Sequence, residues 1–176
     1  MTLYQRLARF AARHNLRPPL LKYGFNWSPM YRRTTARLIE VSDDLHRVRI
    51  KLPLSWRNKN YVGTIFGGSM AAATDPIFMI QLINILGPEY VVWDKAGSIQ
   101  FRRPGRGDLT ADFVYTEEEV ARIKARVREV GEYVFTKQTE LTAIRTGEVV
   151  ARVERTVYVA DREHYRAKRE RKREGS

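Results

Sequence analysis

Residues 60–75 read Asn-Tyr-Val-Gly-Thr-Ile-Phe-Gly-Gly-Ser-Met-Ala-Ala-Ala-Thr-Asp, and the fold depends on the element that this stretch begins. Its two adjacent glycines, Gly67 and Gly68, open an apolar run that continues to Leu86 and stops at a Gly-Pro pair. Because such a pair is typical of the end of a helix, the run predicts one long helix. A helix that is apolar on nearly every side is stable only when other elements wrap it.

The same run is long and apolar enough to raise the question of a membrane span over residues 69–86. Four polar or helix-breaking residues interrupt it: Asp75, Pro76, Gln81 and Asn84. They favour a buried central helix over a membrane span. Pro76 has no backbone N–H group, so we expect it to kink the helix or to begin a second one with Asp75 as its N-cap.

Segments with a period of two lie on both sides of this helix and predict β-strands. In residues 45–52, Val48, Ile50 and Leu52 alternate with basic residues. We expect strands at 34–41, 45–52, 90–102, 108–115, 132–144 and 148–160, and a helix with a capping box at 116–130. The turn at 103–107 is expected to join the strands at 90–102 and 108–115. Runs of strands around one buried helix indicate an α+β fold with an antiparallel sheet.

The length of 176 residues predicts one main domain with short additions at its ends. We expect an N-terminal helix, with its apolar face over residues 3–13, and an irregular aromatic covering segment within residues 1–33. The main domain is expected at 34–160. Residues 161–176 are dense in charge and predict a basic tail that is disordered or a frayed helix.

The composition excludes several classes of function. The chain has no cysteine and only three histidines, so we expect neither disulfides nor a cysteine- or histidine-based metal site. Its 32 basic and 20 acidic residues give a net charge of +12, which favours an anionic partner. The N-terminus does not resemble a signal peptide, and we expect a cytoplasmic protein. The basic run at 166–173 favours a solvated terminus over a nucleic-acid site.

The stretch that begins the helix also carries the candidate chemistry. The first N–H groups of a helix lack internal partners, so the Gly67-Gly68 start can bind a carbonyl oxygen that gains negative charge. Asp75 lies two turns further on. A carboxylate among apolar side chains destabilises the fold unless it is paired with a positive charge or takes part in catalysis. Its alternative role is the N-cap of a helix beginning at Pro76. Residues 67–71 only partly match a serine-hydrolase nucleophile elbow, and the partner histidine is missing.

Residues 60–75 resemble the motif of hotdog-fold thioesterases of the phenylacetate-pathway type. Asn60, Gly67, Gly68 and Asp75 match that motif in type and spacing, whereas Phe66 stands where the motif has histidine. The Asp-Pro pair at 75–76 and the Trp-Asp-Lys sequence at 93–95 resemble the DUF4442 branch. The resemblance covers roughly residues 34–160, and it implies a hotdog fold, in which an antiparallel sheet wraps a long central helix.

The resemblance further implies hydrolysis of an acyl thioester, with coenzyme A as part of the substrate and no other cofactor. Asp75 would act as general base or nucleophile, Asn60 would orient water or substrate, and Gly67 and Gly68 would bind the carbonyl oxygen. Phe66 and Ser69 would contact the substrate. The candidate phosphate-binding residues are Arg102, Arg103 and Arg106, for which a solvated turn is the alternative.

The superfamily also implies a homodimer or a dimer of dimers, in which each site draws on two subunits. Because phenylalanine cannot donate a hydrogen bond, Phe66 keeps a second hypothesis open. In that hypothesis the protein binds acyl-coenzyme A or a fatty-acyl group without hydrolysing it.

Overall fold

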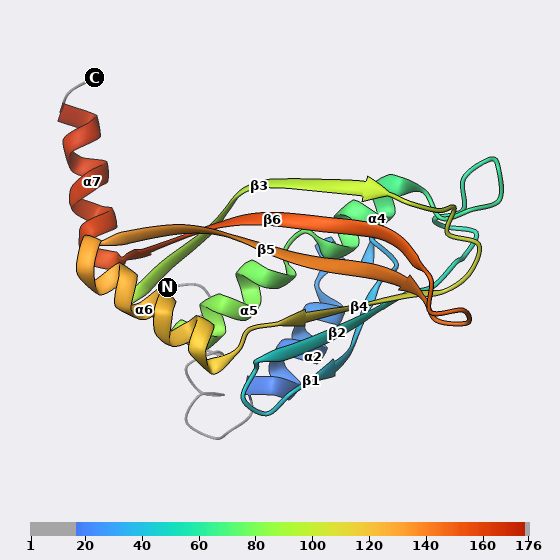
Figure 1. Ribbon diagram of the computed structural model, residues 1–176, viewed down its shortest axis with the longest axis horizontal. Helices are drawn as coiled ribbons and strands as arrows, with labels where there is room; N and C mark the ends of the chain where they lie inside the picture. The colour runs from blue at the N-terminus through green and yellow to red at the C-terminus, as the bar shows by residue number, and fades with distance from the viewer. Residues whose placement is uncertain (1–16, 175–176) are drawn as a thin grey trace.

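A strongly curved antiparallel sheet of six strands wraps the helical run that starts at Gly67 (Figure 1). The computed structural model describes residues 17–174. The strands lie in the order β1-β2-β4-β5-β6-β3. Their bounds are β1 Arg37–Val41, β2 Arg47–Leu52, β3 Tyr90–Phe101, β4 Leu109–Val114, β5 Glu132–Ala143 and β6 Val149–Asp161. The α+β class and the wrapped helix predicted from the sequence are confirmed.

The central helix is divided in two by Asp75 and Pro76. Helix α4 spans Gly67–Thr74 and helix α5 spans Ile77–Leu86. Pro76 is the N-cap of α5, and Asp75 is the C-cap of α4, so the N-cap alternative for Asp75 is wrong. By length and composition Gly67–Leu86 is apolar enough to cross a membrane, but the sheet wraps it and half of its apolar window is buried, as in the core helix of a soluble protein.

Strands β3 and β4 are not neighbours, although only a short turn separates them in sequence. β3 pairs with β6 along its length and forms one edge of the sheet, whereas β4 lies between β2 and β5. The segment that connects them therefore crosses from one edge to the middle of the sheet. The segment joins the two strands in sequence, as expected, but they do not pair with each other, and β3 keeps one edge unpaired within the described residues.

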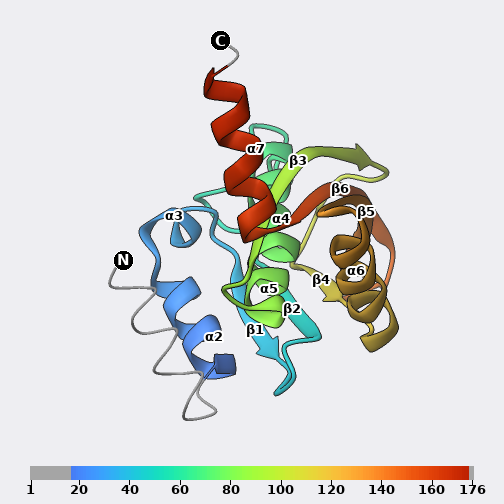
Figure 2. The ribbon, with the colours of Figure 1, turned by 90° about the vertical axis from the view of Figure 1, so that its left-hand side faces the viewer.

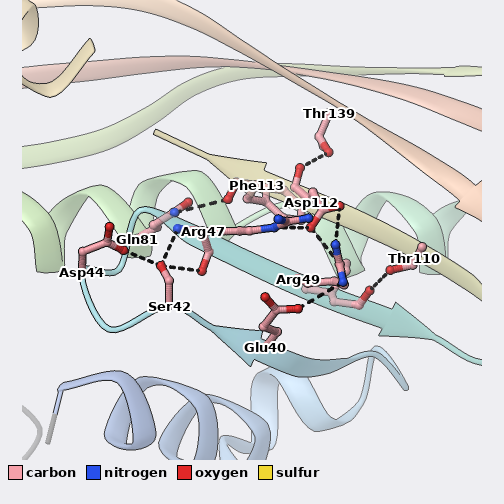
Figure 3. A network of polar contacts seen from close by, with 11 residues as sticks. Glu40, Ser42, Asp44, Arg47, Arg49, Gln81, Thr110, Asp112, Phe113 and Thr139 are labelled. Atoms are coloured by element: carbon pink, nitrogen blue, oxygen red, sulfur yellow. Dashed lines mark hydrogen bonds and ion pairs between the residues drawn. The ribbon is translucent and has the colours of Figure 1, made fainter. Parts of the chain in front are cut away.

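The inner face of the sheet and the α4–α5 run enclose the hydrophobic core. Phe78 of α5 packs edge-to-face against the rings of Phe113 and Tyr115. A buried amide fixes the helix in place. Gln81 Nε2 donates to the Phe113 carbonyl oxygen at 3.3 Å (Figure 3) and to the Leu45 carbonyl oxygen at 2.8 Å. The helix position is thus set by directional bonds as well as by apolar contact.

Polar pairs connect strands β2 and β4 in the same region. Arg49 Nε donates to Asp112 Oδ1 at 2.9 Å, and Arg47 Nε contacts the same oxygen at 3.1 Å (Figure 3). These pairs are partly exposed, so their contribution to stability is small. They hold the register of two strands that cover the middle of the helix.

The N-terminal covering segment is helical rather than irregular. Helix α2 spans Arg17–Trp27 and helix α3 spans Pro29–Arg32. The two prolines at 18–19 lie in the first turn of α2, where a missing N–H group costs nothing. The Tyr31 hydroxyl is buried and donates to the Ala73 carbonyl oxygen at 3.0 Å, which ties this segment to α4. The helix expected at residues 3–13 lies outside the described residues.

Two further helices lie outside the sheet (Figure 2). Helix α6, Glu117–Val130, begins with the expected capping box between Thr116 and Glu119. Helix α7, Arg162–Glu174, occupies the segment for which the sequence predicted either disorder or a frayed helix. It has no buried residue and extends away from the body. At its first residue, Arg162 Nε donates to the Pro88 carbonyl oxygen at 2.5 Å, and in its middle Lys168 pairs with Glu132. Its charges are compatible with a helix because they stay in solvent.

Candidate active site

The start of α4 presents backbone N–H groups that the helix itself cannot bond. Gly67 and Gly68 are its first two residues, after Phe66 as the N-cap. A side chain at Gly67 would lie 2.7 Å from the Phe101 ring of β3, and one at Gly68 would lie 2.3 Å from the Phe66 ring. A side chain at either position would therefore displace an aromatic ring that packs directly on the backbone. The arrangement can stabilise an oxyanion.

Phe66 covers part of this helix start. Its side chain is well exposed, at 57%, and its ring lies on Gly68. Phenylalanine offers an apolar surface and no hydrogen-bond donor at a position where relatives of the motif have histidine. An aromatic ring thus packs on each of the two glycines at the helix start.

Asn60 closes the loop that leads into α4. Its Oδ1 atom accepts from the backbone N–H groups of Thr64, at 3.0 Å, and Val62, at 3.2 Å. Its Nδ2 atom donates to Thr64 Oγ1 at 3.0 Å. A primary amide has two N–H donors, so one remains for a ligand. The structure gives Asn60 a clear loop-forming role beside the site.

A surface hollow of about 500 Å³ brings five of the predicted residues together. The Ile65 N–H group donates to the Gly105 carbonyl oxygen at 2.9 Å, which joins the loop before α4 to the segment after β3. The lining residues include Asn60, Gly67, Phe101, Arg102, Arg103 and Arg106. Phe66, Gly68, Ser69 and Asp75 are not in the lining. One positive wall therefore faces the helix start.

Asp75 lies at the other end of α4, in surroundings that differ from the expected apolar ones. Its side chain is 61% exposed, and its Oδ1 atom pairs with Arg155 Nη1 at 2.8 Å. Arg155 Nη2 also donates to the Ala71 carbonyl oxygen at 3.2 Å, near the end of the same helix. The carboxylate is therefore held by an arginine rather than enclosed by apolar side chains.

Arg155 is a site residue that the sequence reasoning missed. It lies on β6 in the inward-facing row with Val153 and Val157, and it is only 9% exposed. The residue opposite on β3 is Gly97, where any side chain would lie 2.1 Å from Arg155 Nη1. An arginine within an alternating row of valines was a visible signal, since a charge on the core face needs a partner.

Asp94 of β3 completes this cluster and was also missed. Its Oδ1 atom is buried without a hydrogen-bond partner, and a bulge follows it in the pairing of β3 with β6. Burial raises the pKa of Asp94 to about 6; the charge of Asp75 adds to the rise and Arg155 opposes it. A perturbed carboxyl beside a paired one is a frequent sign of a functional site.

The two halves of the candidate site are separated along α4. Asp75 follows Gly67 by eight positions, a rise of about 12 Å in an α-helix. Groups that act on one thioester must lie within a few ångströms of its carbonyl carbon. Within one chain, the helix start and Asp75 therefore cannot serve the same carbonyl. Among residues 17–174, no group of three acidic or histidine side chains is placed to hold a metal ion.

Comparison with known proteins agrees with this architecture. A sequence model of the family described as "Domain of unknown function (DUF4442)" matches residues 20–159. No curated protein gives a significant match to the chain.

Solved structures show the same fold at low sequence identity. A Pseudomonas aeruginosa protein described as a probable thioesterase superposes with a TM-score of 0.68 at 20% identity, covering 92% of this chain and 98% of its own. Thioesterase superfamily member 2 of zebrafish gives 0.58 at 17% identity, covering 82% and 96%. A thioesterase from Haemophilus influenzae gives 0.52 at 12%, covering 92% of each chain.

Proposed function

The chain belongs to the DUF4442 family and has the hotdog fold, and from this premise we propose that it hydrolyses acyl thioesters of coenzyme A. The observation that carries the proposal is that helix α4 has free backbone N–H groups at its start and a carboxylate at its end. Its glycine start faces a hollow lined by arginines, and its other end holds Asp75 against Arg155. An oxyanion site, a carboxylate and a cationic wall are what this reaction needs.

In the proposed reaction the thioester oxygen binds at the Gly67-Gly68 start of α4. The backbone N–H groups and the positive end of the helix stabilise the negative charge that develops on this oxygen. Asp75 acts on the attacking water as general base, or attacks the carbonyl carbon itself. The free N–H donor of Asn60 orients the substrate, while Phe66 and Ser69 lie beside its acyl part.

Arg102, Arg103 and Arg106 would bind the phosphate groups of coenzyme A. All three are exposed and line the hollow that reaches Gly67. Arg103 also pairs with Glu148 at 3.3 Å, an exposed contact that a phosphate can replace at small cost. The wider positive charge of the chain attracts such an anion. We place the protein in the cytoplasm, where these thioesters are used.

The proposed site is formed by two copies of the chain. The separation of Gly67 from Asp75 means that a second copy must supply one of them. The unpaired edge of β3 lies beside the cluster of Asp75 and Asp94, and an exposed strand edge readily pairs with another strand. We expect a homodimer, or a dimer of such dimers. Light scattering that shows a monomer at micromolar concentration would contradict the composite site.

A screen of acyl-coenzyme A esters of different chain length and aromatic character tests the proposal. Release of the free thiol is followed with a thiol reagent, and mass spectrometry identifies any acyl compound that co-purifies with the protein. We expect at least one ester to be hydrolysed well above the uncatalysed rate. A complete absence of hydrolysis across the screen would contradict the proposed activity.

Phe66 favours one alternative, an acyl-coenzyme A or fatty-acyl binding protein without catalysis. Its ring lies on Gly68, and it cannot donate the hydrogen bond that a histidine would supply. The same screen separates the two functions. Tight binding of an acyl ligand without thiol release would establish the alternative.

A further inference from the structure

We propose that Asp94 is a second catalytic carboxylate of the thioesterase site and that Arg155 is the positioning residue that makes it one. The inference rests on the proposed function and adds to it the path of the proton. Asp94 is on the edge strand β3, and Arg155 is on its neighbour β6. Both side chains belong to the inner face of the sheet, where they meet Asp75 at the junction of α4 and α5.

The geometry around Arg155 is built to hold a charge inside the fold. Its guanidinium lies over Gly97, and a bulge in β3 between residues 94 and 96 brings that glycine opposite it. Two of its nitrogens bond Asp75 and the Ala71 carbonyl oxygen, while its buried Nε atom has no partner. An unpartnered donor in a nine-tenths buried arginine is costly, which indicates that a ligand or water completes the set.

Asp94 also has a polar atom whose hydrogen bonding is unsatisfied. Its Oδ1 atom is buried and without a partner among the described residues. The charged and titratable groups that face it are Asp75 from the helix junction, Arg155 from β6 and Tyr115 from the end of β4. Beyond them, Lys137 of β5 lies over the Tyr115 ring and pairs with Glu119. Asp75 is thus the only other carboxylate among the groups that face Asp94 directly.

The two carboxylates have different tasks because Arg155 contacts only one of them. The 2.8 Å pair with Arg155 fixes the position of the Asp75 carboxylate, which takes a proton from water and passes it on. Burial and the neighbouring Asp75 charge raise the pKa of Asp94 to about 6, which suits a group that accepts and returns a proton near neutral pH. Two carboxyl groups in different environments can divide such work.

The reaction balances as follows. The water oxygen forms a bond to the thioester carbonyl carbon, and one water proton passes by way of Asp75 and a bridging water to Asp94. The C–S bond breaks with its electron pair on sulfur, and Asp94 returns the proton to the thiolate. The second water hydrogen stays on the carboxylic acid product, which then ionises. Both carboxylates end the cycle as they began it.

The test uses Asp94→Asn, with Asp112→Asn as the matched control on another strand of the sheet. For the best thioester of the screen, we expect the rate of the natural protein to rise with pH through about 6. Asp94→Asn should lower kcat about 100-fold, change KM little and remove this limb of the pH profile. Asp112→Asn should keep both the rate and the limb. Arg155→Lys should shift the limb along the pH axis, because the charge of Arg155 opposes the rise in the pKa of Asp94 and lysine places that charge differently.

A second measurement does not depend on activity. Carbon-13 NMR of aspartate side chains should show one carboxyl that titrates near 6 and disappears in Asp94→Asn. If the natural protein hydrolyses a thioester and Asp94→Asn keeps its rate and pH profile, the inference is wrong and the proposed function stands. If the natural protein hydrolyses none, the proposed function and this inference fall together. A carboxyl titrating below 4 at Asp94 would also overturn the inference.

Discussion

At the scale of single residues, the candidate site consists of side chains that cost stability where they stand. Among the described residues, Arg155 is buried with one unpartnered nitrogen, and the half-buried Asp94 has one buried oxygen without a partner. A valine and a serine or asparagine would pack at these positions with less penalty. Because these side chains lower the stability of the fold and lie at one helix junction, a catalytic role explains them better than a structural one.

This view predicts that Asp94→Asn stabilises the fold in a pH-dependent way. Because burial raises the pKa of Asp94 to about 6 in the folded state, the natural protein loses stability as pH rises through 6. Asparagine carries no charge and escapes that loss. Thermal melts should give Asp94→Asn a higher Tm than the natural protein at pH 8, and a similar one at pH 4.

Asp112→Asn should show the opposite sign. Burial raises the pKa of Asp112, but hydrogen bonds from Arg49 and Arg47 outweigh it and lower the pKa overall. Its contribution to stability is therefore present at pH 8 and lost as pH falls, so this variant should melt lower at pH 8. Equal shifts for both variants at pH 4 and pH 8 would contradict the assignment of Asp94.

Phe66 supplies a prediction about activity. Phe66→His introduces a donor at the start of α4, beside the carbonyl site, and should raise or preserve the rate of thioester hydrolysis. Phe66→Leu, which keeps the position apolar, should bring no gain. The measurement is kcat for both variants with the same ester. A severe loss in Phe66→His at an unchanged melting temperature would show that the site does not use this position as its relatives' motif does.

At the scale of elements, the sequence predicted most of the fold because its patterns are local. The strand alternation, the capping box at Thr116 and the apolar run from Gly67 are all confirmed within a few residues. What the sequence left open depends on distant partners. The pairing of β3 with β6, instead of β4, and the position of Arg155 over Gly97 follow from register between strands far apart in sequence. No local pattern specifies them.

Helix α7 gives the element whose role is simplest to test. It buries no side chain. Its ties to the body include exposed hydrogen bonds from Arg162 to the carbonyl oxygens of Pro88 and Tyr90, pairs of Lys168 and His164 with Glu132, and a ring contact between Tyr165 and Tyr158. Such exposed pairs contribute little. Truncation after Asp161 should leave the Tm within a few degrees in a thermal melt. A large drop would show that α7 is part of the folded core.

At the scale of the whole molecule, the sequence predicted both halves of the candidate site and the two helical turns between them, but not the side chains that surround Asp75. Gly67 and the arginines at 102, 103 and 106 do line one hollow, as the motif and the charge suggested. Asp75 lies two helical turns away and is paired with Arg155 of β6. Asp94 and Arg155 escaped notice because only the folded sheet brings them to the helix. A second copy of the chain is what would join the halves.

The most direct test of the central claim is the rate of thioester hydrolysis by Asp75→Asn, measured with the best substrate of the screen on protein whose melting curve matches that of the natural chain. Asp43→Asn, in an exposed turn, is the control. If Asp75 acts on the water or on the carbonyl carbon, kcat should fall by about 10²–10⁴-fold, while KM changes much less. A folded Asp75→Asn protein that hydrolyses the ester at the natural rate would contradict the account.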